Sequence, residues 1–453
     1  MPGAGLFHGS YVHSALGKRD AWVQNAPFHF HPDDPHSMAD SEKSLAQLAP
    51  PTGLRKAELV AIVAGLMTLN AMAIDIMLPA LSQIAAATGL AQNGQATDNR
   101  QQLIIFAYVL GFGAPQLVWG PVTDRFGRRA PLFVGLVGYI AASLVCVMMR
   151  DFWGLLAARF LQGLFSSGAR TVAGAVVRDL FAGRAMASFM SLVMTIFMIV
   201  PIVAPSLGQL ILTFAPWEGI FLWLAIWGGL MLAWTWMRLP ETLPAASRRP
   251  IDLASVTQAY LAVVRTPVSL GYMCASGFIF GAMFAFIASS EQVFRQVFEK
   301  GESFALWFAG VAAMLAVANF TNSRLVERIG MRRISHTALI VFTVISGALA
   351  MLPVVFGENF AIFFPLFAVA FGCFGMMGAN FSALALEPLG RIAGTASAAY
   401  GFASTLVSSV LGLLIGSMFD GTTVPLMAGF AVLGLASLVI VLITEKGRLF
   451  SRH

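Results

Sequence analysis

Charged residues are scarce in this chain of 453 residues. Only 11% are Asp, Glu, Lys or Arg, whereas 58% are hydrophobic, and the mean hydropathy is +0.77. A soluble domain carries about twice that fraction of charges. Because so few charges cannot cover a water-facing surface, the composition excludes a soluble globular protein and favours a polytopic membrane protein.

Cysteine is scarce too. Cys146, Cys274 and Cys373 lie far apart in apolar stretches, without the spacing of metal ligands or of a disulfide framework. No basic segment followed by a short apolar run opens the chain, so we expect no cleavable signal peptide. The basic residues that give the net charge of +6 lie between apolar runs. This distribution is typical of the loops of a membrane protein and argues against a nucleic-acid partner.

Long apolar runs, by contrast, are abundant. A helix needs about 20 apolar residues to cross a bilayer. Barrel strands instead alternate over about 10 residues, and these runs are continuous. The sequence therefore predicts an all-α membrane protein with twelve transmembrane helices, at residues 57–79, 101–119, 131–149, 152–177, 186–214, 218–237, 267–289, 303–321, 335–356, 360–382, 394–416 and 424–444.

The basic residues predict the orientation. With the N-terminus inside, 22 of the 28 Lys and Arg residues lie in inner segments and 4 in outer segments. Cytoplasmic loops are enriched in Lys and Arg. We therefore predict that both termini are cytoplasmic and that the chain is a multi-pass protein of a bacterial inner membrane.

A repeat divides the twelve predicted helices into two sets of six. GPVTDRFGRR at 120–129 recurs as SRLVERIGMRR at 323–333, with an offset of 203 residues. Two pseudo-symmetric halves around a central cavity are the layout of secondary transporters. The predicted parts are a six-helix half at 57–237, a solvated cytoplasmic linker at 238–266, a second half at 267–444 and a cytoplasmic tail at 445–453.

Residues 1–56 form a separate N-terminal extension. Its first 37 residues hold five of the seven histidines, among scattered Pro and Asp. A metal-binding tail is one interpretation. Because the histidines have no regular spacing, we favour a disordered cytoplasmic extension and expect no metal site.

Ionisable residues are rare inside the predicted helices. Asp75 is the one acid placed well inside a span, and Arg159 and Arg170 are the bases. The second half is predicted to have no such group, only amides and hydroxyls such as Asn380. Since a charge in hydrocarbon is costly, each is a functional candidate. Asp75 and Arg159 lie at similar depths, which allows a pair that switches a proton or, alternatively, a fixed structural ion pair.

Helical spacing places several small or polar residues on one face of the fourth predicted span. Arg159, Gly163, Ser166, Arg170 and Gly174 recur every three or four residues. We expect this face to line a wet cavity, although Arg170 can instead extend toward the inner surface. The predicted substrate contacts are Asn70, Phe106, Tyr108, Gln162, Arg170 and Asn380.

Two segments suit gates. In GPVTDRFGRR, Gly120 and Gly127 predict tight turns, and Asp124 can cap a helix or pair with a base. The prolines of PIVAPSLGQ can bend the fifth span. An ordinary positive-inside loop and ordinary helix prolines are the alternatives. The predicted gating residues are Gly120, Asp124, Arg125, Gly127, Arg129, Arg178, Asp179, Pro201, Pro205 and Gly208.

These segments resemble the major facilitator superfamily over about residues 57–444. GPVTDRFGRR is similar to the loop signature between its second and third spans. Similarity also extends to its span-1 motif of drug:proton antiporters (IDIMLPAL, 74–81), its span-4 motif (RFLQG, 159–163) and its span-5 antiporter motif (APSLGQ, 204–209). Four further segments resemble the Bcr/CflA branch, which is of the bicyclomycin and chloramphenicol resistance type. They are VVRDLF (176–181), EQVFRQVF (291–298), NSRLVERIG (322–330) and ALALEPLGRIAGTASA (383–398).

The resemblance implies the fold of that superfamily, alternating access by rocking halves, and proton-driven export. It assigns a proton-coupling carboxylate to Asp75, a coupling arginine to Arg159, and gating roles to Asp124, Arg125, Pro205 and Gly208. It also implies a monomer that uses the proton gradient and no cofactor. Two departures stand out, since Gln209 replaces the usual second glycine of the span-5 motif, and Glu218 follows Trp217 where arginine is common.

The leading prediction is proton-coupled antiport of amphipathic small molecules or drugs, with substrates, protons and the lipid bilayer as partners. The alternative is a transporter of the same superfamily that exports or takes up one metabolite, since a buried arginine such as Arg170 can bind a carboxylate. A membrane enzyme would need a cluster of ionisable catalytic groups, which the sequence lacks. Two fused halves suit alternation better than a channel.

Overall fold

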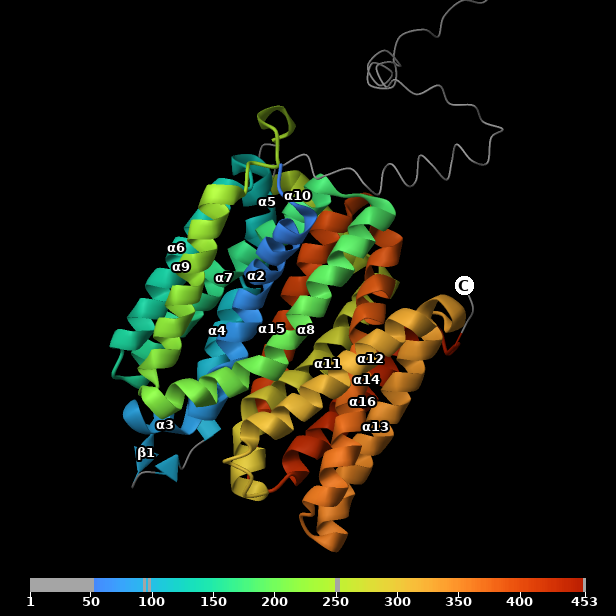
Figure 1. Cartoon of the computed structure of the whole chain (residues 1–453). Coiled ribbons are helices and arrows are strands. Elements are labelled where there is room, and N and C mark those ends of the chain that lie inside the picture. Colours follow the sequence, from blue (N-terminus) through green and yellow to red (C-terminus); the bar gives the residue numbers. More distant parts are fainter. Residues whose placement is uncertain (1–52, 93–94, 97–98, 249–252, 451–453) are drawn as a thin grey trace, which may run out of the picture. The chain divides into compact units, whose positions relative to one another are not determined.

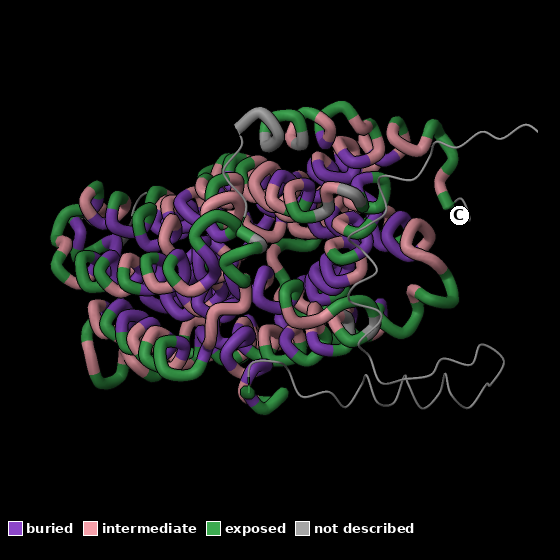
Figure 2. The backbone as a smooth tube through the Cα atoms, turned by 90° about the horizontal axis from the view of Figure 1, so that it is seen from above, coloured by how far each residue is buried: buried purple, intermediate pink, exposed green. Residues whose placement is uncertain are grey.

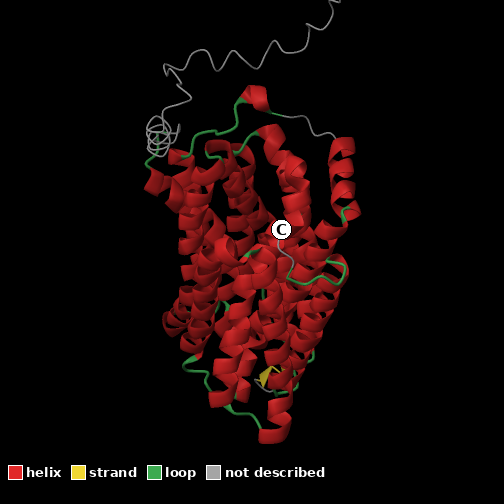
Figure 3. Cartoon of the chain, turned by 90° about the vertical axis from the view of Figure 1, so that its right-hand side faces the viewer, coloured by secondary structure: helices red, strands yellow, loops and turns green. Residues whose placement is uncertain are grey.

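The structure is a computed structural model that describes residues 53–92, 95–96, 99–248 and 253–450. The predicted extension at 1–56 lies outside the described residues except for its last four. The described chain is helical, with one antiparallel pair of two-residue strands, β1 (Ala91–Gln92) and β2 (Gln95–Ala96), shown in Figure 3. The predicted all-α class is therefore confirmed.

The helices follow one another with short connections, and Figure 1 labels most of them. The α-helices are α2 (Lys56–Asp75), α3 (Leu81–Ala87), α4 (Leu103–Gly113), α5 (Gln116–Phe126), α6 (Arg129–Met148), α7 (Phe152–Leu180), α8 (Gly183–Phe214), α9 (Glu218–Arg238), α10 (Leu253–Arg265), α11 (Pro267–Gln292), α12 (Phe304–Ile329), α13 (Met331–Phe356), α14 (Phe360–Leu386), α15 (Ala393–Ser417) and α16 (Val424–Thr444). Shorter turns are η2 (Leu78–Ala80), η3 (Asn99–Gln102), η4 (Ala245–Ser247), η5 (Val293–Val297, a π-helix) and η6 (Glu387–Ile392).

Many of these helices can cross a membrane. Among the described residues, ten are long and apolar enough, or eleven if the bent pair formed by η3–α4 and α5 is one span. That pair bends by 41°, next to Pro115. Helix α7, which contains Arg159 and Arg170, is not among them, so the predicted number of twelve stays a prediction.

The outward faces of the helices are apolar. Figure 2 shows exposed residues along the outer sides of the helices and buried residues toward the interior. Met148, Phe214, Met237 and Ile443 are each more than 70% exposed. Soluble proteins rarely expose so many apolar side chains. A bilayer provides the apolar surroundings that these side chains need.

The packing separates two groups of helices. We call α2–α9 the N-terminal group and α11–α16 the C-terminal group; between them, α15 packs against α4 and α5, and α12 packs against α8. Glycines permit the close approach. A Cβ at Gly412 would lie 3.0 Å from the Phe106 ring, and a Cβ at Gly416 would clash with the Gln102 side chain.

The linker is more structured than the sequence predicted. Its residues 253–265 form α10, which packs against α11 and α15. The Tyr260 hydroxyl donates a hydrogen bond to the Leu117 carbonyl oxygen at 2.9 Å. The linker therefore contacts both groups at the side where α5 ends. We call this side, at the top of Figure 1, the loop side, and the side of α3 and the strands the strand side.

Candidate functional site

Asp75 is the last residue of α2, at a break in the first membrane segment. The chain turns at Ile76 and Met77, passes through η2 and resumes as α3. Asp75 is only 5% exposed, and its carboxylate forms no hydrogen bond or ion pair with the other described residues. It is thus a buried acid without a fixed partner, which is the condition for a change of protonation to matter.

Helix α8 packs directly on this break. A Cβ at Gly208 would clash with the carbonyl oxygen of Ile76, so only a glycine allows the two backbones to meet here. Pro201 and Pro205 lie earlier in the same helix. The structure therefore brings the predicted gating residue Gly208 next to the residue that follows Asp75.

Arg159 joins three helices. Its guanidinium donates hydrogen bonds to the carbonyl oxygens of Ile104 at 3.2 Å and Ala73 at 3.0 Å, and to Gln162 Oε1 at 2.5 Å. It also lies over the Tyr108 ring, 4.4 Å from the ring centre. The charge of this fully buried arginine is thereby stabilised by carbonyl oxygens and an aromatic ring rather than by an acid.

The predicted pair of Asp75 and Arg159 does not form in this structure. Instead, Arg159 binds the carbonyl of Ala73, in the last turn of α2, the turn that contains Asp75. The carbonyls at a helix C-terminus carry partial negative charge, which a nearby cation stabilises. Both residues therefore lie at the same helix end, and Arg159 holds the backbone of that end.

The face of α7 around Arg159 packs against α4. A Cβ at Gly163 would clash with the Tyr108 carbonyl oxygen. Gln162 donates to Ser143 Oγ at 2.7 Å, and the Tyr108 hydroxyl donates to Ser166 Oγ at 2.8 Å. This part of the face holds a buried polar network, in place of the cavity wall that helical spacing predicted.

Of the six predicted substrate contacts, two keep polar atoms without a partner. Arg170 is half-buried, with its guanidinium 5.9 Å from the Phe112 ring centre and no hydrogen bond to the other described residues. Asn70 Oδ1 is buried and unpartnered. Unmet polar atoms of this kind are the groups that a bound molecule can satisfy.

The remaining predicted contacts meet neighbouring helices. Phe106 packs against Gly412 of α15, and Asn380 donates to Asn322 Oδ1 at 2.8 Å, which joins α14 to α12. Tyr108 and Gln162 belong to the network described above. Among the described residues, no three His, Cys, Asp or Glu side chains are grouped to hold a metal ion.

Arg128 is the centre of the charged cluster on the loop side. It donates to both carboxylate oxygens of Asp179, at 2.8 and 3.0 Å, and to Asp124 at 2.7 Å. Burial acts to lower the pKa of Arg128, but these two acids hold that pKa above its ordinary value. Asp124 and Asp179 were predicted as gating residues, whereas Arg128 was missed because three arginines lie within five residues and spacing does not distinguish them.

A further acid, Glu241, closes this cluster from the end of α9. Its carboxylate accepts hydrogen bonds from the backbone N–H groups of Arg128 and Arg129, at 2.8 and 3.2 Å, at the start of α6. Gly127 has a φ of +85°, and a Cβ there would lie 2.5 Å from the Glu241 carboxylate. The predicted turn at Gly127 is therefore confirmed, and its distant partner is identified.

Other predicted gating residues have different surroundings. Gly120 lies inside helix α5, so the predicted turn there is wrong, and the chain bends instead at Pro115. Arg125 is exposed and stacks on Phe126 at 5.5 Å. Arg129 donates to the Trp236 carbonyl oxygen at 3.0 Å, and Arg178 is exposed.

The C-terminal group has a related cluster on its own loop. Arg332 donates to Glu445 Oε1 at 2.9 Å, and the Tyr272 hydroxyl donates to the same oxygen at 2.6 Å. Burial acts to raise the pKa of Glu445, but these hydrogen bonds outweigh it and hold that pKa below its ordinary value. Gly330 repeats the positive φ of Gly127, at +92°.

Hydrogen bonds between the two groups gather at the strand side, and we call this set the seal. Ser82 donates to Glu291 at 2.6 Å, and Gln102 donates to Gln292 at 2.7 Å. Gln209 donates to the carbonyl oxygen of Glu302 at 2.9 Å. The departure from the antiporter motif at Gln209 therefore supplies a bond across the interface. The seal comprises Ser82, Asn99, Gln102 and Gln209 with Ser289, Glu291, Gln292, Glu302, Gly416, Ser417 and Phe419.

Glu291 corrects one prediction, because the second half does contain a buried acid. It is 1% exposed in α11. The predicted span ended at 289, whereas the helix continues to Gln292 and through η5, and Ser82 covers the carboxylate from the other group. The i, i+4 spacing of Glu291 and Arg295 is the sequence signal that could have extended this span.

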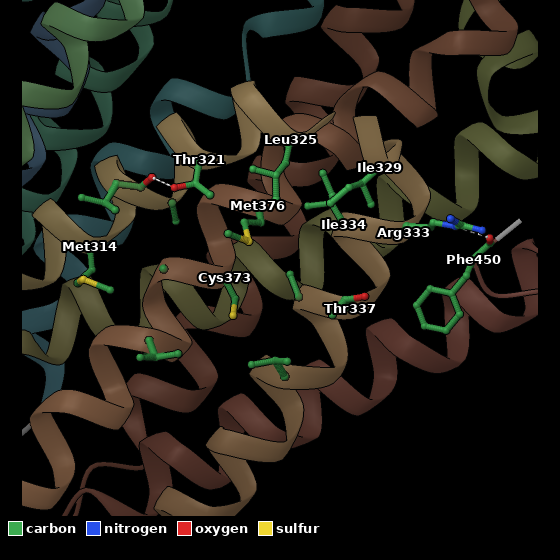
Figure 4. Close-up of a pocket in the computed structure, with 16 residues that line it drawn as sticks. Met314, Thr321, Leu325, Ile329, Arg333, Ile334, Thr337, Cys373, Met376 and Phe450 are labelled. Carbon is green, nitrogen blue, oxygen red and sulfur yellow. Dashed lines mark hydrogen bonds between the residues drawn. The ribbon is translucent and has the colours of Figure 1, made fainter. Parts of the chain in front are cut away.

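A cavity of ≈ 690 Å³ lies elsewhere, between α12, α13 and α14. Figure 4 shows its apolar lining, with Cys373 and Met376 on one side and Thr337 and Ile334 on another. Arg333 lies at one end and donates to the Phe450 carbonyl oxygen at 3.4 Å. None of the predicted substrate contacts lines this cavity, which belongs to the C-terminal group alone.

Comparison with known sequences identifies a matching family and several similar proteins. The family model described as "Major Facilitator Superfamily" matches residues 62–413. An uncharacterized MFS-type transporter, YdgK, of Bacillus subtilis (strain 168) is 30% identical over 83% of this chain and 93% of its own. A bicyclomycin resistance protein homolog of Haemophilus influenzae is 30% identical over 78% and 87%, and the multidrug resistance protein MdtL of Escherichia coli is 28% identical over 84% and 94%.

Solved structures show the same fold at low identity. A D-xylose-proton symporter aligns with a TM-score of 0.69 and 14% identity, over 87% of this chain and 99% of its own. The human organic anion transporter MFSD10 aligns with a TM-score of 0.55 and 18% identity, over 86% and 100%. The resemblance noted in the sequence is thus confirmed at the level of superfamily and fold.

Proposed function

Because this chain belongs to the major facilitator superfamily and is thus a membrane transporter, we propose that it exports amphipathic small molecules in exchange for protons. The relatives named for bicyclomycin resistance and multidrug resistance support drug-like substrates. The observation that carries the proposal is the buried, unpartnered Asp75 at the break of α2, against Gly208 of α8.

The proposed topology completes the membrane region. Helix α7 is the twelfth span and crosses the bilayer between α4 and α6, with Arg159 held by hydrogen bonds inside the protein. The α2–α9 and α11–α16 groups are the two six-helix halves. Both termini lie in the cytoplasm of a bacterial cell, in keeping with the surplus of Lys and Arg on the loop side. The seal then lies at the outer surface, and this structure represents a state closed to the outside.

The proposed exchange depends on the end of α2. An ionised Asp75 favours an arrangement in which water or a substrate's polar group reaches it, and a neutral Asp75 tolerates burial. Arg159 holds the Ala73 carbonyl in the same turn, so this end is fixed to α4 and α7. Since α8 rests on Ile76, a change at Asp75 is transmitted to α8 and, through Gln209, to the C-terminal group. The proton gradient supplies the energy, and no cofactor is required.

The test uses everted membrane vesicles with an acid interior. Chloramphenicol-like compounds, quinolones and cationic dyes are added in turn, and proton release is followed with a pH-quenched fluorophore. We expect release with at least one compound class in the wild type and a fall to background for Asp75→Asn, because the amide cannot exchange a proton.

The matched control is Glu299→Gln, which removes an exposed acid. This variant should release protons as the wild type does. Active, proton-coupled transport by a correctly inserted Asp75→Asn protein would contradict the assigned role of Asp75.

A second candidate function is transport of one anionic metabolite. Arg170 favours it, because its half-buried guanidinium has no hydrogen-bond acceptor among the described residues and can bind a carboxylate. Competition by small carboxylates that Arg170→Gln abolishes would favour this function. Insensitivity of drug-driven proton release to such anions would favour export of drugs.

A further inference from the structure

The seal contains one charged hydrogen-bonding side chain among the residues that the structure describes. Its other side-chain partners are the hydroxyls of Ser82 and Ser289 and the amides of Asn99, Gln102, Gln209 and Gln292. Glu302 takes part only through its backbone carbonyl. Among the side chains that form these hydrogen bonds, Glu291 is therefore the one whose charge changes when a proton binds.

The two carboxylate oxygens of Glu291 have unequal surroundings. Oε1 accepts the hydrogen bond of Ser82 at 2.6 Å and lies 3.3 Å from Arg295 Nε. Oε2 is buried and has no hydrogen-bond partner. In the closed seal, an ionised Glu291 would therefore leave part of its charge unsolvated.

Glu291 also borders a small pocket at the strand side. The pocket has a volume of ≈ 210 Å³ and includes Gln83 from α3, Gln209 from α8 and Arg295 from η5. Gln83 is exposed, and the side chain of Arg295 is 48% exposed. Arg295 is the one charged neighbour in this lining, since α3, α8 and α12 present neutral groups.

We propose that Glu291 is a second proton-binding site, which takes up a proton from outside when the seal closes. In the open state, water reaches both carboxylate oxygens of Glu291. In the closed state, this water is excluded and only the hydroxyl of Ser82 takes its place. Arg295 lies four residues away in the same helical segment and accompanies Glu291 in both states, so its attraction largely cancels. Closing therefore favours the neutral acid, and external acid favours the closed seal.

This second site rests on the proposed antiport and sharpens it. After a substrate leaves outward, the carrier must return to the state closed to the outside. A proton from outside that binds Glu291 during closure favours this return. It goes back to the outside when the seal opens again, so the site biases closure without consuming a proton of the exchange.

The test measures closure directly in the full chain, without a substrate. Spin labels are placed at Ala86→Cys and Met418→Cys, two exposed positions at the strand-side ends of α3 and α15, in a Cys274→Ala background. Cys146 and Cys373, which are buried, are replaced by Ala as well, so that only the two introduced cysteines carry labels. Distances are recorded in lipid nanodiscs from pH 8 to pH 5, and the ratio of closed to open states should rise by up to about tenfold per pH unit for one proton.

The variants separate this site from Asp75. With Asp75→Asn alone, the pH response should persist, and Asp75→Asn with Glu291→Gln should stay closed at every pH. The amide that Glu291→Gln introduces cannot exchange a proton, yet its carbonyl oxygen can still accept from Ser82 and so preserve the fold. Ser82→Ala should lower the closed fraction at all pH values but retain a pH response. The control Glu302→Gln should respond like its parent.

Several results would overturn the proposal. A pH response that survives in the double variant, or that is already lost in Asp75→Asn, would place the titrating group elsewhere. So would loss of the response in Glu302→Gln. If the seal responds through Glu291 while proton release in vesicles does not depend on Asp75, the proposed antiport fails and the proton site at the seal stands.

Discussion

The two groups of helices fill their interiors with different chemistry. In the N-terminal group, Arg159, Gln162 and Ser143 form a chain of hydrogen bonds deep in the membrane region. In the C-terminal group, a cluster of aromatic rings fills part of the interior, and Phe286 alone contacts four others, among them Phe367 at 4.6 Å. Hydrogen bonds depend on direction and charge, whereas ring packing is much less directional.

This contrast divides the work of the proposed exchange. An interior held by directional bonds changes its preferred geometry when a proton binds nearby, while an apolar interior moves as a body. Glu291 refines the contrast, because it lies at the edge of the C-terminal group and faces the other group. Chemistry is therefore concentrated in the N-terminal group and at the interface, and the following substitutions test that division in order of decreasing effect on transport.

Arg159→Lys is expected to have the largest effect. A single ammonium group cannot reach the three acceptors on α2, α4 and α7 with the geometry of a guanidinium. We expect loss of proton-coupled transport and a decrease in the free energy of unfolding on the order of 2–4 kcal/mol. Thermal unfolding in detergent and the vesicle assay measure both quantities.

Arg150→Lys is its control, since this arginine is exposed and pairs with Glu218 at the surface. Its effect on stability should stay below about 1 kcal/mol. Equal losses for the two variants would show that Arg159 has no special place in the N-terminal group.

Gly208→Ala should come next. The added methyl group meets the Ile76 carbonyl oxygen, so α8 must move away from the break of α2, at a cost of about 1–3 kcal/mol. We expect transport to fall several-fold, with a change in the closed fraction of the seal. Gly229→Ala, in α9 with no atom within 4 Å of the new Cβ, should leave transport unchanged.

Arg128→Lys tests the loop-side cluster. Lysine loses the two-pronged contact with Asp179, which we expect to cost about 1–3 kcal/mol and to speed amide hydrogen exchange around residues 124–128. Arg125→Lys is the matched control in the same loop, because Arg125 is exposed. A larger effect at Arg125 than at Arg128 would contradict the geometry of the cluster.

Phe367→Leu should have the smallest effect on transport. Loss of the ring removes contacts with Phe286, Phe363 and Phe371 and should lower the free energy of unfolding by about 1–2 kcal/mol. Because this interior only supports the C-terminal group, the number of protons exchanged for each substrate should not change. A changed proton coupling would show that the two interiors are not divided as described.

The pattern of apolar residues along the sequence predicted the helices. It could not predict which residues of different helices meet in the fold. Apolar length located the spans, and the spacing in GPVTDRFGRR located the turn at Gly127. The acids that bind Arg128 beside that turn are Asp179, near the end of α7, and Glu241, in the segment after α9, and no spacing along one helix specifies them. The same holds for Arg159, whose acceptors include backbone carbonyls that every residue possesses.

The errors have a common physical cause. Gly120 predicted a turn because glycine permits one, but the helix of α5 accommodates it and Pro115 lies at the bend. Glu291 follows the predicted span at 267–289, so it was expected to face water. In the structure, the N-terminal group covers it through Ser82. In each case, residues distant in sequence decide the environment of a residue whose local signal allows two outcomes.

The way in which Arg159 is neutralised has a consequence for the biogenesis of the protein. An arginine at the centre of a span opposes insertion by about 2.5–3.5 kcal/mol, and α7, a span in the proposed topology, carries both Arg159 and Arg170. The carbonyl acceptors of Arg159 belong to α2 and α4, which leave the ribosome before α7. In that topology, the early helices prepare the site that receives a poorly hydrophobic later one, so α7 enters the bilayer as a member of an assembly, in an order that the chain itself sets.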